Sequence, residues 1–217
     1  MDNFERLFNE QRKGSVDQHR PDYDSALNCF DYGIVLSIQA SKKERSGDYA
    51  GAINDYKESL REDVRDWYIT YNQIAINYLM LEHYEKARIA FNIAIELKGK
   101  LQLSGVDEID IPYVASGVVT NVSEERMYSN RAKVRLILGD YKGCLADCNK
   151  SIEINPYFSN SYFITGLLYM HIDQPENAYQ ALDQADSLGH PQALLVIQQL
   201  ISKIAVDHMS PILVRED

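Results

Sequence analysis

Two cysteines, Cys144 and Cys148, come closest in type and spacing to a chemical site. Four residues apart on a helix, they would share one face and could offer two soft thiolate ligands to a metal ion. No histidine lies near them in the sequence, and free cysteine commonly packs as a small buried apolar side chain. An i,i+4 pair is also poorly placed for a disulfide. We therefore expect both cysteines to occupy packing positions.

The other groups that could do chemistry are dispersed. The histidines, which form no HExxH pair, are His19, His83, His171, His190 and His208. The sequence shows no glycine-rich phosphate loop, no nucleophile elbow and no Cys-His arrangement. Function must be argued from a site. We therefore expect a non-catalytic protein with no metal and no cofactor.

Composition narrows the class of partner. Hydrophobic residues make up 45% and charged residues 25%, a globular balance, and the net charge is -10. No basic run offers the surface that nucleic acid or an anionic membrane requires. The segment from Met1 to Phe8 lacks the apolar run of a signal peptide, no stretch is long enough to span a membrane, and three cysteines suit a reducing compartment. These features predict a cytoplasmic location, with neither nucleic acid nor membrane as a partner.

The sequence repeats with a period of about 34 residues, which sets the spacing of its predicted helices. Gly-Asp-Tyr occurs at 47–49 and again at 139–141, each time before a predicted second helix. Position 17 of the unit is then held by Tyr49, Tyr84, Tyr141 and Pro175. This register predicts repeats at 33–66, 68–101, 125–158 and 159–192.

Small side chains recur within this register, where two antiparallel helices would approach closely. Position 8 holds Ala40, Ala75, Ala132 and Gly166; position 20 holds Ala52, Ala87, Cys144 and Ala178; position 27 holds Ser59, Ala94, Ser151 and Ala185. Larger residues at position 24 are predicted to fill the space alongside: Tyr56, Phe91 and Leu182, with Cys148 the small exception.

Further spaced residues complete the pattern. Position 4 holds Tyr71, Tyr128 and Tyr162, position 11 holds Tyr78 and Tyr169, and Asn155-Pro156 closes the third unit. The pattern resembles the tetratricopeptide repeat over about 136 residues. The resemblance implies an all-α fold, a right-handed α-α superhelix of about four helical hairpins with a C-terminal capping helix.

The parts outside the repeats have their own patterns. Residues 1–21 form a polar N-terminal segment, and the solenoid is predicted to cover 22–207. A capping helix is expected at 191–206, with Pro191 at its first position, before a tail at 208–217.

An insertion at 102–124 separates the second and third repeats. Half of residues 106–119 are large and apolar, which is unusual for a solvated loop. The segment also carries three acidic residues, and the nearest basic residues are Arg126, Arg131 and Lys133. We expect the segment to lie against the stack, across the groove, as an internal stand-in for a ligand.

The resemblance also nominates a binding surface, because the first helix of each tetratricopeptide repeat lines the concave face. The residues at the corresponding positions are Asn72, Gln73, Ile76, Arg126, Ser129, Asn130, Lys133, Asn160, Phe163 and Ile164. Their amides could bond the N–H and C=O groups of an extended peptide, and their apolar members could hold its side chains.

The third repeat, at Tyr128–Ala132, resembles the middle repeat of carboxylate-clamp co-chaperones, which grip the acidic C-termini of heat-shock chaperones. That clamp requires lysine and asparagine in the preceding repeat and lysine and arginine in the following one. The corresponding residues here are Asn72, Ile76, Asn160 and Ile164, and Asn130 alone matches. The charges that would neutralise a terminal carboxylate are missing.

The sequence therefore predicts a scaffold or adaptor that binds a protein or peptide segment in a concave groove. Two alternatives stay open. One is a dedicated inhibitor or immunity-type protein that blocks a single partner, and the other is a structural subunit whose terminal helices pair with other copies. The sequence leaves the oligomeric state open.

Overall fold

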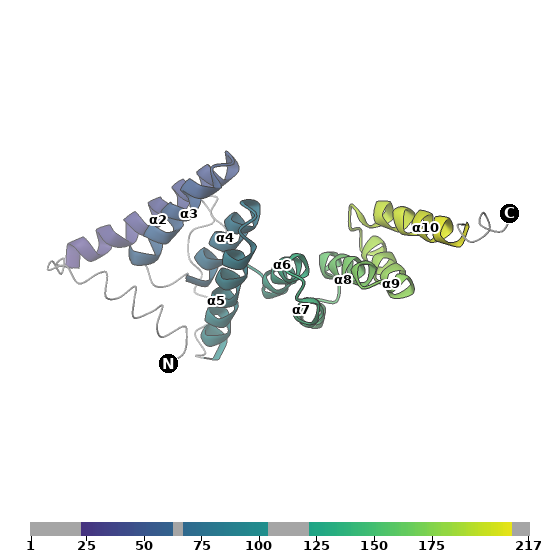
Figure 1. The fold of residues 1–217 in the computed structure, drawn as a ribbon. Helices are drawn as coiled ribbons and strands as arrows, with labels where there is room; N and C mark the ends of the chain where they lie inside the picture. The colour runs from purple at the N-terminus through teal and green to yellow at the C-terminus, as the bar shows by residue number, and fades with distance from the viewer. Residues whose placement is uncertain (1–22, 63–66, 104–121, 210–217) are drawn as a thin grey trace. The chain divides into compact units, whose positions relative to one another are not determined.

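The computed structural model describes residues 23–62, 67–103 and 122–209, and this part of the chain contains α-helices and no β-strand (Figure 1). The helices are α2 (Tyr23–Arg45), α3 (Tyr49–Glu62), α4 (Trp67–Met80), α5 (Tyr84–Leu103), α6 (Glu124–Ile137), α7 (Tyr141–Ile154), α8 (Ser159–His171), α9 (Pro175–Ser187) and α10 (Ala193–Met209). The expected all-α class is confirmed.

The helices pair in order along the chain as hairpins, α2 with α3, α4 with α5, α6 with α7 and α8 with α9. They belong to two compact units, Met1–Ser123 and Glu124–Asp217, where the sequence predicts one solenoid. In the first unit α3 packs on α4. In the second, α7 packs on α8, α6 also contacts α8, and α10 covers α9.

Close helix contacts explain the sequence register. All twelve small residues at positions 8, 20 and 27 are buried, and so are the four residues at position 24. Short side chains at a crossing bring the helix backbones together, and the larger neighbour fills the remaining volume. Burial at these positions agrees with the packing role that the predicted register gives them.

Because these positions are buried, a larger side chain at one of them should overpack the core. Ala132 on α6 is fully buried, and Cys144 and Cys148 of α7 belong to the same core cluster. Replacing Ala132 with leucine should lower the free energy of unfolding by about 1–3 kcal/mol, because three extra carbons force the helices apart. Urea denaturation followed by circular dichroism measures this. The neighbouring exposed change Lys133→Leu is the control, and an equal loss in both variants would contradict the assigned packing.

Each hairpin turns through a residue in the left-handed region of the backbone map. The φ angles are +84° at Gly47, +58° at Glu82, +76° at Gly139 and +56° at Asp173. The following N–H then donates to a carbonyl five residues back, as Asp140 N does to Arg135 O at 2.9 Å. This hydrogen bond caps the first helix and redirects the chain.

Two of these turns carry a side chain where glycine is favoured. We expect Glu82→Gly to raise the free energy of unfolding by about 0.5–1 kcal/mol, because the left-handed penalty of a Cβ exceeds the extra chain entropy of glycine. Thermal denaturation of Glu82→Gly beside Gly139→Ala checks this. The two variants should shift the midpoint in opposite directions, and a lower midpoint for Glu82→Gly would refute the explanation.

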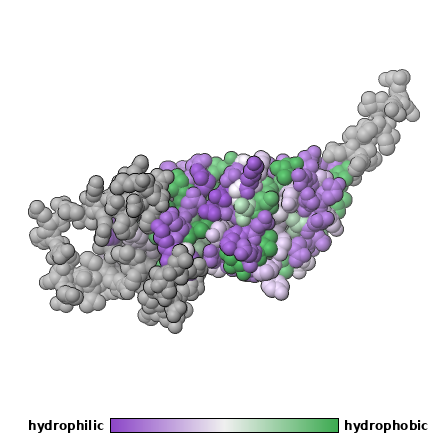
Figure 2. Space-filling model, turned by 90° about the horizontal axis from the view of Figure 1, so that it is seen from below, coloured by the Kyte–Doolittle hydropathy of each residue, from purple (hydrophilic) through white to green (hydrophobic). Residues whose placement is uncertain are grey.

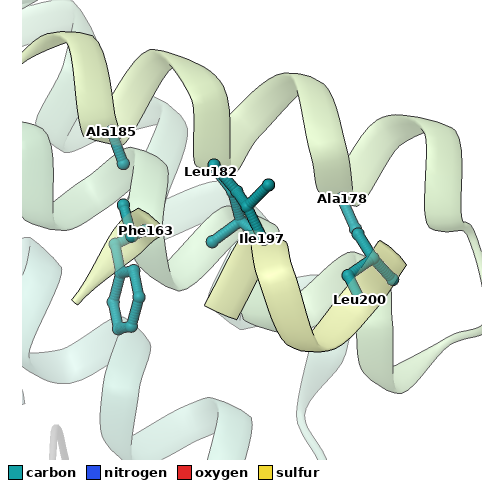
Figure 3. Packing of buried hydrophobic residues seen from close by; sticks show 7 residues of the cluster. Phe163, Ala178, Leu182, Ala185, Ile197 and Leu200 are labelled. Carbon is teal, nitrogen blue, oxygen red and sulfur yellow. The ribbon is translucent and has the colours of Figure 1, made fainter. Parts of the chain in front are cut away.

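Helix α10 closes the second unit. It begins at Ala193, two residues after the predicted start at Pro191. Ala193, Ile197 and Leu200 are buried in one cluster with Leu182 and other residues of α8 and α9 (Figure 3). Leu194 and Ile201, two other large apolar residues of this helix, are exposed. The helix therefore caps α9 with one narrow face.

The surface is mixed. On the face drawn in Figure 2, hydrophilic and hydrophobic residues of the described part are interspersed. Large apolar side chains do reach solvent, among them Ile137 on α6, Tyr157 before α8 and Leu195 on α10. None of the described helices is long and apolar enough to cross a lipid bilayer.

Candidate protein-interaction face

In the second unit the first helices of the two hairpins, α6 and α8, contact one another. Asn160 on α8 joins them, because its Nδ2 donates to Ser129 Oγ on α6 at 2.7 Å. Ser129 is fully buried and Asn160 is partly exposed. The hydrogen bond therefore fixes the register between the two helices at the predicted surface.

One stripe of α6 remains open to solvent beside this bond. Arg126, Asn130, Lys133 and Ile137 follow one another at spacings of four, three and four residues, which places them on one helix face. Arg126, Lys133 and Ile137 are exposed, and Asn130 is partly exposed. We call these four residues the α6 stripe.

Four of the ten nominated residues are buried: Asn72, Ser129, Phe163 and Ile164. Phe163 stacks on His190 with ring centroids 3.9 Å apart, and burial lowers the pKa of His190, which favours the neutral ring there. Ile164 packs in a cluster with Cys144 and Leu168. In this conformation these side chains contribute to packing.

The remaining six nominated residues reach solvent. On α4 these are Gln73 and Ile76, both partly exposed, and Asn72 Nδ2 donates to Gln73 Oε1 at 3.2 Å. On α6 and α8 they are Arg126, Asn130, Lys133 and Asn160. The accessible set is thus richer in amides and basic groups than the full set.

A charge network that the sequence did not predict lies between α6 and α7. Arg131 makes two hydrogen bonds to the Asp147 carboxylate, at 2.9 and 2.7 Å, and Arg135 Nη1 lies 3.0 Å from Asp147 Oδ2. Arg135 Nη1 also donates to Gly143 O at 3.0 Å. The Asp147 side chain is only 4% exposed. The spacing of these residues could have predicted the network. Asp147 lies between the two packing cysteines, and Arg131 and Arg135 form an i,i+4 pair on the facing helix.

The network changes the role of Arg131. The sequence nominated it, with Arg126 and Lys133, to receive the acidic residues of 106–119, but its guanidinium is paired with Asp147. Arg126 and Lys133 have no acidic partner among the described residues. The insertion segment 104–121 lies outside the described residues, so its predicted docking stays a prediction.

The cysteines pack as expected. Both are fully buried and unpaired, in a cluster with Ala132 and Ile164. The hydrogen bond between the two thiols raises the pKa of Cys144 and lowers the pKa of Cys148. In the described ranges no group of three or more histidine, cysteine, aspartate or glutamate side chains is placed to hold a metal ion.

Comparison with known protein families identifies one repeat in the chain. Residues 125–158 match the tetratricopeptide-repeat family model, which is the third predicted repeat. The hairpin at these residues is therefore a tetratricopeptide repeat. The match coincides with α6 and α7, the hairpin that carries the α6 stripe and the Arg131–Asp147 network.

Two relatives and two solved structures are similar. The Hsp70/Hsp90 co-chaperone CNS1 of Saccharomyces cerevisiae is 30% identical over 76 residues, which is 35% of this chain and 20% of the relative. A Protein SGT1 homolog of Oryza sativa subsp. japonica is 26% identical over 93 residues, 42% of this chain and 25% of the relative. The chain thus spans a quarter or less of these relatives.

The structural matches concern the fold alone. The crystal structure of MamA protein aligns with a TM-score of 0.57 at 14% identity, covering 86% of this chain and 97% of that one. The crystal structure of BtubC from P. vanneervenii gives 0.62 at 14% identity, covering 93% and 81%. These likenesses support an all-α repeat superhelix.

Proposed function

We propose that this chain is a non-catalytic interaction adaptor, which binds a peptide or protein segment on the face formed by α6 and α8, the first helices of the two hairpins in its second unit. The observation that carries the proposal is the accessible α6 stripe beside the Ser129–Asn160 bond, within the hairpin that matches the repeat family. A rigid helix pair that presents amides, cations and one exposed apolar side chain suits the capture of an extended segment.

The relatives support the same reading. One is named as an Hsp70/Hsp90 co-chaperone, and the shared region is a fraction of its length. Only the region that this chain shares with the co-chaperone therefore supports a binding role for this chain. A cytoplasmic location without nucleic-acid or membrane partners belongs to the same proposal, and the net charge of -10 argues against polyanionic partners of either kind.

Affinity capture tests the proposal. The full chain is immobilised and incubated with an extract of the cells that produce it. Any captured protein is then purified and titrated against the chain. Two variants each change a nominated residue on the first helix of a hairpin, Ile76→Ala on α4 in the first unit and Asn130→Ala on α6 in the second. Their matched controls are Ile89→Ala on α5 and Asn149→Ala on α7, where both side chains are exposed.

We expect a partner whose affinity falls at least about fivefold in a face variant, which corresponds to the loss of one or two ordinary contacts, and stays unchanged in the controls. Weakening by the α5 and α7 controls alone would reject the first-helix face as the binding surface.

A second candidate function, self-association, rests on helix α10. Leu194, Leu195 and Ile201 are each more than half exposed on this helix. Exposed apolar side chains of this size are typical of helices that pair with another surface. Size-exclusion chromatography with light scattering separates the two functions, because a structural subunit must form a stable oligomer and an adaptor need not.

A further inference from the structure

The α6 stripe also indicates what kind of segment the proposed function would recognise. Arg126 and Lys133 are its two cations, and they are exposed, carry no acidic partner in the described ranges and lie on one face with Asn130 between them. By contrast, Arg131 and Arg135 on the same helix are both paired with Asp147. The cations on one side of α6 thus stabilise the fold, and those on the other side are available to bind a ligand.

Glu125, the acidic residue next to Arg126 in the chain, is engaged away from the stripe. Glu125 Oε1 accepts from Asn155 Nδ2 at 3.4 Å, and the Glu125 carbonyl accepts from Ser151 Oγ at 2.7 Å. Both contacts draw Glu125 towards the region between α7 and α8. A chain with net charge -10 therefore presents a local basic face at Arg126 and Lys133.

The spacing of the two cations sets the geometry of a ligand. Seven residues along an α-helix span about 10 Å. In an extended polyproline II segment, residues three apart lie on one side and are separated by about 9 Å. Two acidic side chains at this spacing can each face one cation, with the intervening backbone opposite Asn130, whose amide can donate and accept.

We propose, on the basis of the proposed function, that α6 binds an internal acidic segment with two carboxylate side chains three residues apart in an extended conformation. The recognised groups are side-chain carboxylates, so a free C-terminus is not required. This differs from a carboxylate clamp, whose cations would occupy the positions of Asn72, Asn160 and Ile164. Charge complementarity favours this ligand over the neutral or apolar segment that the amide-rich full set suggests.

The probe is an eight-residue peptide of alanine and proline with two glutamates three apart, acetylated and amidated so that it has no terminal charge. It is titrated into the full-length isotope-labelled chain, and amide chemical shifts are recorded. The matched peptide has glutamines in place of both glutamates. A third peptide carries the glutamines and a free C-terminal carboxylate.

We expect saturable shifts at Arg126, Asn130 and Lys133 with the glutamate peptide, weakening as salt is raised. The double variant Arg126→Glu with Lys133→Glu should weaken binding about tenfold or more, because two attractive pairs become repulsive. The control Lys142→Glu with Lys203→Glu makes the same charge change at exposed lysines on α7 and α10, and it should retain binding.

Three results would overturn the inference. They are equal binding of the glutamate and blocked glutamine peptides, binding only of the peptide with the free carboxylate, and retention of binding by the α6 double variant. If extract capture still yields a partner that depends on Asn130, the proposed function stands and only the acidic ligand is rejected. If capture also shows no such partner, both fail.

Discussion

Replacing Asp147 with alanine is expected to lower the free energy of unfolding by about 3–5 kcal/mol. The change leaves the guanidinium groups of Arg131 and Arg135 without their shared carboxylate between α6 and α7, where the two side chains are only 13% and 19% exposed. A charge that stays buried without a partner costs far more than the pair itself contributes. Urea denaturation followed by circular dichroism gives the value.

The control for this experiment is an exposed ion pair on the same helix. Lys150 Nζ lies 3.1 Å from Glu153 Oε1, and both side chains are largely exposed. Glu153→Ala should therefore change the free energy of unfolding by about 1 kcal/mol or less. Similar midpoints for Asp147→Ala and Glu153→Ala would show that the α6–α7 network does not hold the hairpin.

Gly166 and Leu182 are expected to show strong energetic coupling. A Cβ built on Gly166 of α8 would lie 2.6 Å from Leu182 Cγ and 3.3 Å from Ala178 O. Gly166→Ala should cost about 1–2 kcal/mol although alanine is the better helix former, because the overpacking cost exceeds the helix-propensity gain. Leu182→Ala, which empties the centre of the cluster in Figure 3, should cost about 2–5 kcal/mol.

The double variant tests whether the added methyl at position 166 is destabilising because it meets Leu182. If it is, the two changes in the free energy of unfolding will not simply add. Once Leu182 is shortened, the added methyl at position 166 has room, so Gly166→Ala should become neutral or stabilising by up to about 1 kcal/mol. Thermal and urea midpoints of the four proteins form the cycle. An identical cost of Gly166→Ala in both backgrounds would mean that the close α8–α9 approach is not limited by Leu182.

The register of the hairpins could be predicted from the sequence because it depends on side-chain size. Residues such as Ala132 and Cys144 lie where two helices touch, so they must be small. Each hairpin contains such a contact, and the requirement for small residues therefore recurs in every unit. The turns repeat for a similar reason, since Gly47 and Gly139 occupy the one position that requires a positive φ.

The binding surface could be predicted only in part. The position of a residue in the repeat predicts the helix face on which it lies. It does not predict which side chain will contact a residue distant in the sequence. Phe163 is nominated for the surface and instead stacks on His190, and Asn160 is held by Ser129 across 31 residues. Arg131 is expected from the sequence to receive the acidic residues of 106–119, whereas Asp147 on the next helix pairs with it.

Crosslinking from residue 130 shows whether a partner protein touches the first-helix face. A photoreactive phenylalanine analogue is placed at residue 130 on α6 in the full chain, and in a parallel protein at the exposed Lys142 on α7. After irradiation in native extract, an interaction role for this face predicts one dominant crosslinked protein from position 130, suppressed by Arg126→Glu with Lys133→Glu, and little from position 142. A partner crosslinked from position 142 and absent from position 130 would contradict it.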